Sequence, residues 1–224
     1  RWFGLLLAAP AVGVLALLVL YPIGYNVVLS LSRVRVGTGL GLSFVGFDNY
    51  AALMRDPTFW VACRNTFTLA VVAVAIEMAL GLAFAVLLDL DVKGTRAARG
   101  LLISPVMLAP VVVALLWRWL YADEYGVLNH LLQRLSLPAV HWLADPRAAM
   151  VSLIISDTWQ TFPFVMMMLL AGLQALPVDP YDAARVDGAT WWQTFRYLTL
   201  PLLRPVIRVA LIIRTTDILR IFDT

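Results

Sequence analysis

The chain has very few of the residues from which proteins build metal centres, disulfide frameworks and phosphate cradles. Its 224 residues include one cysteine, Cys63, and two histidines, His130 and His141. One thiol excludes an internal disulfide framework, and together with two imidazoles it is too little for a usual His/Cys metal site. The only lysine is Lys93, and the sequence contains no G-x-x-x-x-G-K-[ST] phosphate loop. We therefore expect no metal and no cofactor in this chain.

Charged residues are also scarce. They make up 14% of the chain while apolar residues make up 62%, against roughly 25% and 45–50% in soluble domains. The net charge is +3, but the basic residues are scattered singly and form no stripe that a nucleic acid could follow. The composition excludes nucleic acid as a partner and predicts a polytopic membrane protein in contact with lipid.

Apolar runs are what the sequence has in abundance. A spanning helix needs about 20 apolar residues, and four full runs reach that length, with a fifth beginning near Pro205. The four runs are residues 3–30, 66–88, 101–121 and 149–176. Kinks are expected where prolines interrupt the runs, at Pro22, Pro105, Pro110 and Pro163. We expect an all-α, polytopic transmembrane helical bundle, a single domain over 1–224 that is truncated at its C-terminus.

The basic residues set the expected orientation. The short loop 89–99 and the stretch 177–208 carry a higher density of Lys and Arg than the longer loops 31–65 and 122–148. Because cytoplasmic loops are enriched in these residues, we expect the N-terminus and the stretch after residue 177 to lie in the cytoplasm.

This stretch contains the signals of two short helices. Asp179 is a suitable N-cap, and Pro180 suits the first helical position. Gly188 can adopt the left-handed conformation that ends a helix. Thr190 and Gln193 then form the pattern of a capping box at a second helix start.

A short, well-capped helix with small side chains suits docking into a groove of a partner. Ala183 and Ala184 leave one side of it smooth. A solvated connector is the alternative. A DNA-binding helix-turn-helix is a third interpretation, which the acidic residues and the two flanking spans disfavour.

The same stretch resembles a known motif. The segments Asp182-Ala183-Ala184, Asp187-Gly188-Ala189 and Leu198-Thr199-Leu200-Pro201 match the pattern E-A-A-x-x-x-G followed after nine residues by I-x-L-P. This is the EAA loop of permease subunits of bacterial ABC importers, with Asp182 in place of Glu and Leu198 in place of Ile. Stretches at 44–60, 117–129, 171–177 and 214–223 extend the resemblance to the carbohydrate branch, maltose and trehalose types included.

The resemblance implies the type I ABC importer permease fold in the bacterial inner membrane. Its cytoplasmic loop, residues 179–201 between the fourth and fifth full spans, would carry the coupling helix. The implied partners are a second permease subunit, two ATP-binding subunits that hold ATP and Mg, and an extracytoplasmic substrate-binding protein. The chain itself would be no enzyme. The implied coupling residues are Tyr181, Asp182, Ala183, Ala184, Asp187, Gly188 and Ala189.

Ionisable and aromatic residues within the apolar runs suggest a path for a sugar, favoured as trehalose or a maltose-like disaccharide. Ionisable side chains in spans usually face a cavity or a partner, and sugars contact aromatic faces and polar groups. The candidate path residues are Asp157, Trp159, Gln160, Phe162, Asp217 and Arg220. Asp217 and Arg220 could instead form a structural ion pair, and Glu77 an interhelical hydrogen bond.

Two other functional classes remain open at this point. A stand-alone secondary transporter or channel would predict internal repeats with paired broken helices, and the halves of the sequence lack convincing self-similarity. A membrane-embedded enzyme would need a nucleophile–base pair or a metal cluster at the level of the spans. Neither histidine lies in a full run.

Overall fold

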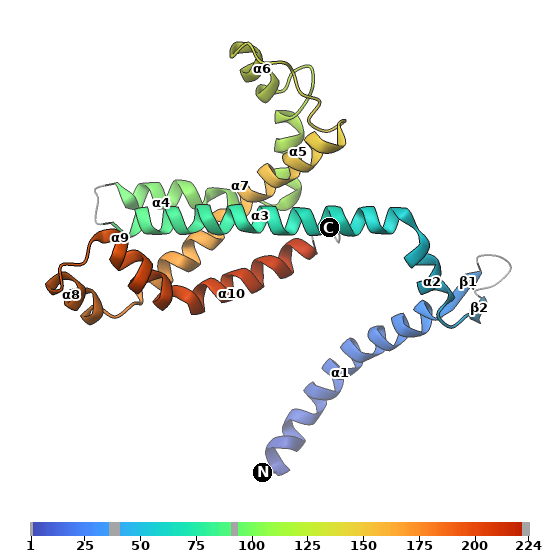
Figure 1. Cartoon of the computed structure of the whole chain (residues 1–224). Helices are drawn as coiled ribbons and strands as arrows, with labels where there is room; N and C mark the ends of the chain where they lie inside the picture. Colours follow the sequence, from blue (N-terminus) through green and yellow to red (C-terminus); the bar gives the residue numbers. More distant parts are fainter. Residues whose placement is uncertain (1, 36–40, 91–93, 221–224) are drawn as a thin grey trace. The chain divides into compact units, whose positions relative to one another are not determined.

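The computed structural model describes residues 2–35, 41–90 and 94–220 (Figure 1). The chain divides into two compact units, Arg1–Arg64 and Asn65–Thr224. The elements of the first unit are α1 (Trp2–Ser30), β1 (Ser32–Arg35), β2 (Gly41–Phe44), α2 (Asp48–Arg55) and the start of α3 (Pro57–Asp89). The second continues with α4 (Thr95–Ile103), the 3-10 turn η1 (Ser104–Met107), α5 (Pro110–Leu120), α6 (Val127–Arg134), α7 (Pro146–Gln174), α8 (Asp179–Val186), α9 (Trp191–Thr194), the π-helical turn η2 (Phe195–Thr199) and α10 (Leu200–Leu219).

The first unit contains a small β-hairpin that the all-α prediction did not include. Strands β1 and β2 are antiparallel, with Ser32 opposite Phe44. The segment alternates polar and apolar residues and is rich in glycine, which favours a short hairpin. Asn49 donates hydrogen bonds to the carbonyls of Ser30 and Ser32 at 2.9 and 3.0 Å, which ties α2 to the start of the hairpin.

The second unit is held together by close packing of α7 against α3 and α10. A Cβ placed on Gly81 of α3 would lie 2.7 Å from Val165 of α7, and one placed on Gly172 of α7 would lie 2.9 Å from Leu203 of α10. Small residues at such positions let two helix backbones approach closely in a membrane, where dispersion contacts drive helix association. Val165 and Leu203 belong to one buried apolar cluster.

The third predicted span, residues 101–121, is not one continuous helix. Ala97–Met107 and Pro110–Leu120 meet at a bend of 97°, and Leu108 and Ala109 between them have extended backbone. Pro110 explains the break, because a proline lacks an N–H and disfavours helical conformation in the residue before it. The predicted kink at Pro110 is thus confirmed as a break. Gln160 of α7 donates to the exposed carbonyl of Leu108 at 3.4 Å.

Among the described residues, three helices are long and apolar enough to cross a membrane, or four if the bent pair is one span. They are Ala8–Ser30, Pro57–Asp89 and Pro146–Gln174. The helix that follows the polar stretch starts at Leu200, before the predicted Pro205. It is not one of the apolar spans, because it carries Arg204, Arg208, Arg214 and Asp217.

Candidate functional site

The first candidate site is the helical loop from α8 to η2. Helix α8 begins at Asp179, one residue earlier than predicted, so Val178 is the N-cap. Asp179 is therefore not the N-cap, since the carbonyl of Val178 already accepts the backbone N–H groups of Tyr181 and Asp182 at 2.9 and 3.2 Å. At the other end Gly188 has φ of +72°, as predicted. The sharp reversal that follows requires this conformation, which glycine adopts without strain.

The second helical segment joins the loop directly to α10. Thr190 and Gln193 form the predicted capping box: the backbone N–H of Thr190 donates to Oε1 of Gln193 at 2.8 Å, and that of Gln193 donates to Oγ1 of Thr190 at 3.3 Å. Helices α9, η2 and α10 then follow without a break (Figure 1). Tyr181 fastens α8 to this segment, because its hydroxyl donates to Oγ1 of Thr199 at 3.0 Å. This hydrogen bond joins α8 to the residue that directly precedes α10.

Most of the predicted coupling residues lie at the surface of this loop. Asp182, Ala183, Asp187 and Gly188 are exposed, and Ala184, Ala189 and Tyr181 are half-buried. A depression of about 600 Å³ is lined by Ala183, Ala184, Asp187, Gly188 and Ala189 together with residues of α9 and η2. The loop thus offers a concave, small-residue surface that no described part of the chain fills.

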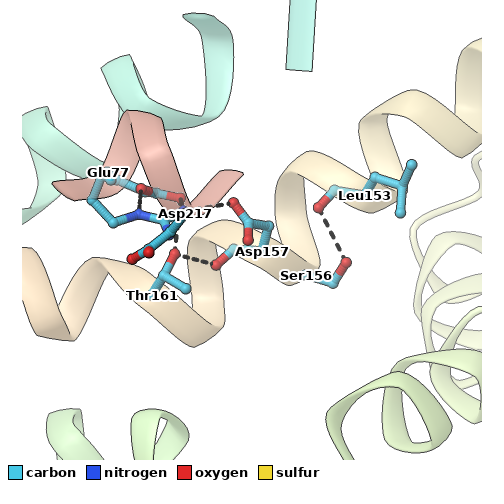
Figure 2. Close-up of polar contacts among 7 residues, drawn as sticks. Glu77, Leu153, Ser156, Asp157, Thr161 and Asp217 are labelled. Carbon is cyan, nitrogen blue, oxygen red and sulfur yellow. Dashed lines mark hydrogen bonds and ion pairs between the residues drawn. The ribbon is translucent and has the colours of Figure 1, made fainter. Parts of the chain in front are cut away.

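The second candidate site is a buried ion network that joins α3, α7 and α10 (Figure 2). Arg214 of α10 donates from Nε to Oε2 of Glu77 at 2.6 Å and from Nη2 to Oε1 at 2.9 Å. The same Nη2 donates to Oδ2 of Asp157 at 3.0 Å. Thr161, one turn after Asp157 on α7, donates to Oε1 of Glu77 at 2.8 Å. One guanidinium therefore serves two carboxylates from two other helices.

This network corrects the predicted pair between Asp217 and Arg220. Oδ2 of Asp217 lies 3.9 Å from Nη1 of Arg214, whereas Arg220 contacts Asp217 only through its backbone N–H, at 3.0 Å. Arg214, which was not among the residues predicted from the sequence, is the centre of this network. A signal was present, because carboxylates at Glu77 and Asp157 inside spans require a cationic partner. Glu77 is hydrogen-bonded between helices, as expected.

A cavity of about 480 Å³ lies between α5 and α7. Asp157 and Gln160 of the predicted path line it, together with Trp117 and Tyr121. Trp159, by contrast, does not line the cavity. Its ring packs edge-on against that of Trp117, with 5.8 Å between the ring centroids. The remaining path candidates are elsewhere: Phe162 packs on Phe84, and Asp217 and Arg220 are exposed on α10.

The cavity wall combines aromatic faces with a few polar groups. The rings of Trp117 and Tyr121 stack at 5.1 Å, and Nε1 of Trp117 is buried without a hydrogen-bond partner in the described part of the chain. The carboxyl group of Asp157 and the side-chain amide of Gln160 thus lie on the wall of one largely apolar space. Such an arrangement suits a small polar ligand with hydroxyl groups. No cluster suited to a metal ion occurs among residues 2–35, 41–90 and 94–220.

The segment between α5 and α7 braces the C-terminal end of α5 against the N-terminal part of α7. The hydroxyl of Tyr121 donates to the carbonyl of Ser152 at 2.9 Å, and Oγ of Ser152 donates to the carbonyl of Trp142 at 3.0 Å. Asn129 is buried, and its side chain bonds both the backbone of Val140 and Nε1 of Trp142. These contacts fix the wall of the cavity at the Tyr121 end.

Apolar helices long enough to span a membrane, a cavity with polar wall residues and an open helical loop define a helical membrane protein. The chain belongs to the family described as binding-protein-dependent transport system inner membrane component, whose model matches residues 77–222. The matched range contains both candidate sites. Membership in this family makes the chain a transport component and not an enzyme, and it confirms the resemblance to ABC importer permeases.

Three similar proteins agree with this assignment. The chain is 41% identical over 180 residues to the trehalose/maltose transport system permease protein MalF of Thermococcus litoralis, covering 80% of this chain and 61% of that protein. It is 35% identical over its whole length to the trehalose transport system permease protein SugA of Mycobacterium tuberculosis, covering 71% of it. A solved bacterial alginate ABC transporter, in complex with an alginate pentasaccharide-bound periplasmic protein, matches with a TM-score of 0.81 at 26% identity, over 98% of this chain and 73% of that one. The chain therefore spans about three fifths to three quarters of these proteins.

Proposed function

We propose that this chain is a permease subunit of an ATP-driven, binding-protein-dependent sugar importer and forms half of its translocation path. The observation that carries the proposal is the family match over residues 77–222, which contains the α8 loop and the α7 wall of the cavity. Trehalose or a maltose-like disaccharide is the favoured substrate. The names of two relatives and the polar residues on the cavity wall support this choice.

The α8 loop is proposed as the docking point for the ATP-binding subunits. Its depression and the open space above Gly188 leave room for a partner, and the continuous segment from α9 to α10 connects that surface to the buried network at Arg214. ATP and Mg would be held by the partner subunits. Nucleotide-driven movement of the partner would then shift α10 with α8.

The sugar path is proposed along the cavity, with Asp157 and Gln160 on its wall and Trp159 behind them. Asp217 and Arg220, exposed on α10, would face the second permease subunit, with Phe162 packing within the bundle. The Lys and Arg distribution supports a cytoplasmic N-terminus and α8 loop. An extracytoplasmic binding protein would deliver the sugar at the opposite side, as the alginate transporter's complex with a periplasmic protein suggests by analogy.

The test is affinity purification of the chain from mildly solubilised native membranes, followed by sugar uptake in proteoliposomes. We expect an ATP-binding subunit and a second permease to co-purify. Uptake of labelled trehalose or maltose should require internal ATP and binding protein, and it should persist when ionophores remove all ion gradients. A chain that purifies alone and transports sugar only with an ion gradient would instead be a secondary transporter.

A further inference from the structure

We propose that Glu77 and Arg214 are positioning residues that present one carboxylate oxygen of Asp157 to the cavity, where it accepts a hydrogen bond from a sugar hydroxyl. This inference rests on the proposed function. It assigns a role to a buried ion pair that lies outside the cavity and does not itself touch the ligand space.

Asp157 stands between the ion pair and the cavity. Its side chain is 13% exposed, whereas those of Arg214 and Glu77 are 5% and 0% exposed. Asp157 lines the cavity, and Arg214 engages only its Oδ2. Oδ1 accepts no hydrogen bond from the residues that the structure describes. One carboxylate oxygen is therefore held in place and the other remains available to a ligand.

Because Arg214 is held by Glu77, it donates only one hydrogen bond to Asp157. The Nε and Nη2 edge of the guanidinium forms a two-point contact with Glu77, the geometry that arginine and a carboxylate favour. Without that contact the same edge would be free to bind both oxygens of Asp157 and turn them away from the cavity. Thr161 reinforces the arrangement, because its hydroxyl lies 2.8 Å from Glu77 and 2.6 Å from the carbonyl of Asp157.

The polar groups on the cavity wall suit a ligand with hydroxyl groups. Asp157 is the member of the cluster that lines the cavity, and an apolar surrounding strengthens a hydrogen bond to it. Gln160 lines the same cavity with its side-chain amide group. A carboxyl group and an amide together match the hydroxyls of a neutral saccharide.

The competing view is that the ion pair only holds three helices together. The kinetics of sugar uptake distinguish the two interpretations. Loss of a purely structural pair lowers the amount of assembled complex and leaves the KM of each assembled complex unchanged. Loss of a positioning pair raises the KM for sugar in complexes that assemble normally.

The experiment measures sugar uptake by the purified complex in proteoliposomes for wild type, Asp157→Ala and Glu77→Gln, with Glu124→Gln as a matched control at an exposed site. Glu77→Gln keeps the shape of the side chain, removes its charge and replaces one of its two acceptor oxygens by an NH2 donor, so the two-point contact with Arg214 is lost. We expect a KM for trehalose or maltose raised about tenfold in both Asp157→Ala and Glu77→Gln, the size of one hydrogen bond. The maximal rate per complex should stay within about twofold of wild type, and the control should match wild type.

A wild-type KM in Glu77→Gln beside a raised KM in Asp157→Ala would overturn the positioning role, and so would a wild-type KM in Asp157→Ala. If Glu77→Gln does not assemble, Glu77→Met combined with Arg214→Met decides, because replacing a buried ion pair by apolar residues is often neutral for stability. A raised KM in that double variant supports positioning and a wild-type KM overturns it. Wild-type protein without ATP-dependent sugar uptake would refute the proposed function itself, whatever the variants do.

Discussion

The polar residues of α8 and those of the buried network meet opposite surroundings. In α8, Asp182 and Arg185 form an ion pair at 2.8 Å, with side chains 59% and 79% exposed. In the network, Glu77 and Arg214 form an ion pair of similar length with almost no exposure. Water screens the first pair, and the second has no water to replace a lost partner. Two ion pairs of similar length therefore contribute differently to the free energy of unfolding.

The comparison also separates two uses of polarity in a membrane protein. The network satisfies its charges within the chain, across three helices. The α8 loop keeps its small and acidic residues at the surface, where a second protein can meet them. A substitution with the same effect on stability and on partner binding in both regions would contradict this distinction. A substitution that affects only one of the two properties would support it.

The largest effect is expected from Arg214→Met. This change leaves Glu77 and Asp157 without their cationic partner, and breaking a buried pair on one side costs about 3–5 kcal/mol. Unfolding of the purified protein by SDS, followed by tryptophan fluorescence, measures the loss. The double variant with Glu77→Met serves as the control and should recover part of it, because only Asp157 is then left without its partner. Equal loss in the single and double variants would mean that the contact contributes through packing and not through charge.

The region that depends on local signals was predicted well from the sequence, and the region that depends on distant partners was not. Gly188 and the Thr190 capping box follow from residues within four positions of each other, so their structure is encoded locally. The ion pair of Glu77 and Arg214 joins residues 137 positions apart. Only the packing of α3 against α7 and α10 brings the two residues together. No periodic pattern in the sequence predicts that packing.

A glycine at a helix contact and a glycine at an open helix surface provide the next contrast. We expect Gly81→Leu to destabilise the protein by about 1–3 kcal/mol, since a Cβ at this position already meets Val165 at 2.7 Å and overpacking carries that cost. The same SDS titration measures the change. Gly100→Leu in α4, where a Cβ meets nothing within 4 Å, is the control and should leave stability unchanged or slightly raised. A tolerated Gly81→Leu would show that α3 and α7 can separate at little cost.

In the α8 loop, Gly188→Trp should act mainly on partner binding. A Cβ at Gly188 meets nothing within 4 Å, so the cost to the chain itself is the left-handed backbone, about 1–2 kcal/mol. Under the proposed function we expect ATP-binding subunits to be lost on purification and sugar uptake to fall below detection. Gly188→Asn tolerates the same backbone and should retain both. Normal uptake by the tryptophan variant would remove α8 from the docking surface.

The smallest effect on stability is expected from Asp182→Asn. The pair with Arg185 is exposed and lies within one helix, so its loss should change the free energy of unfolding by no more than about 0.5 kcal/mol. If α8 docks against a partner, however, the carboxylate becomes partly desolvated there and its removal should weaken co-purification of the ATP-binding subunit. Asp179→Asn, in the first turn of the same helix, controls for loss of charge alone. A variant that leaves both stability and partner recovery intact would show that Asp182 only solubilises the loop, and docking would then rest on the small residues around Gly188.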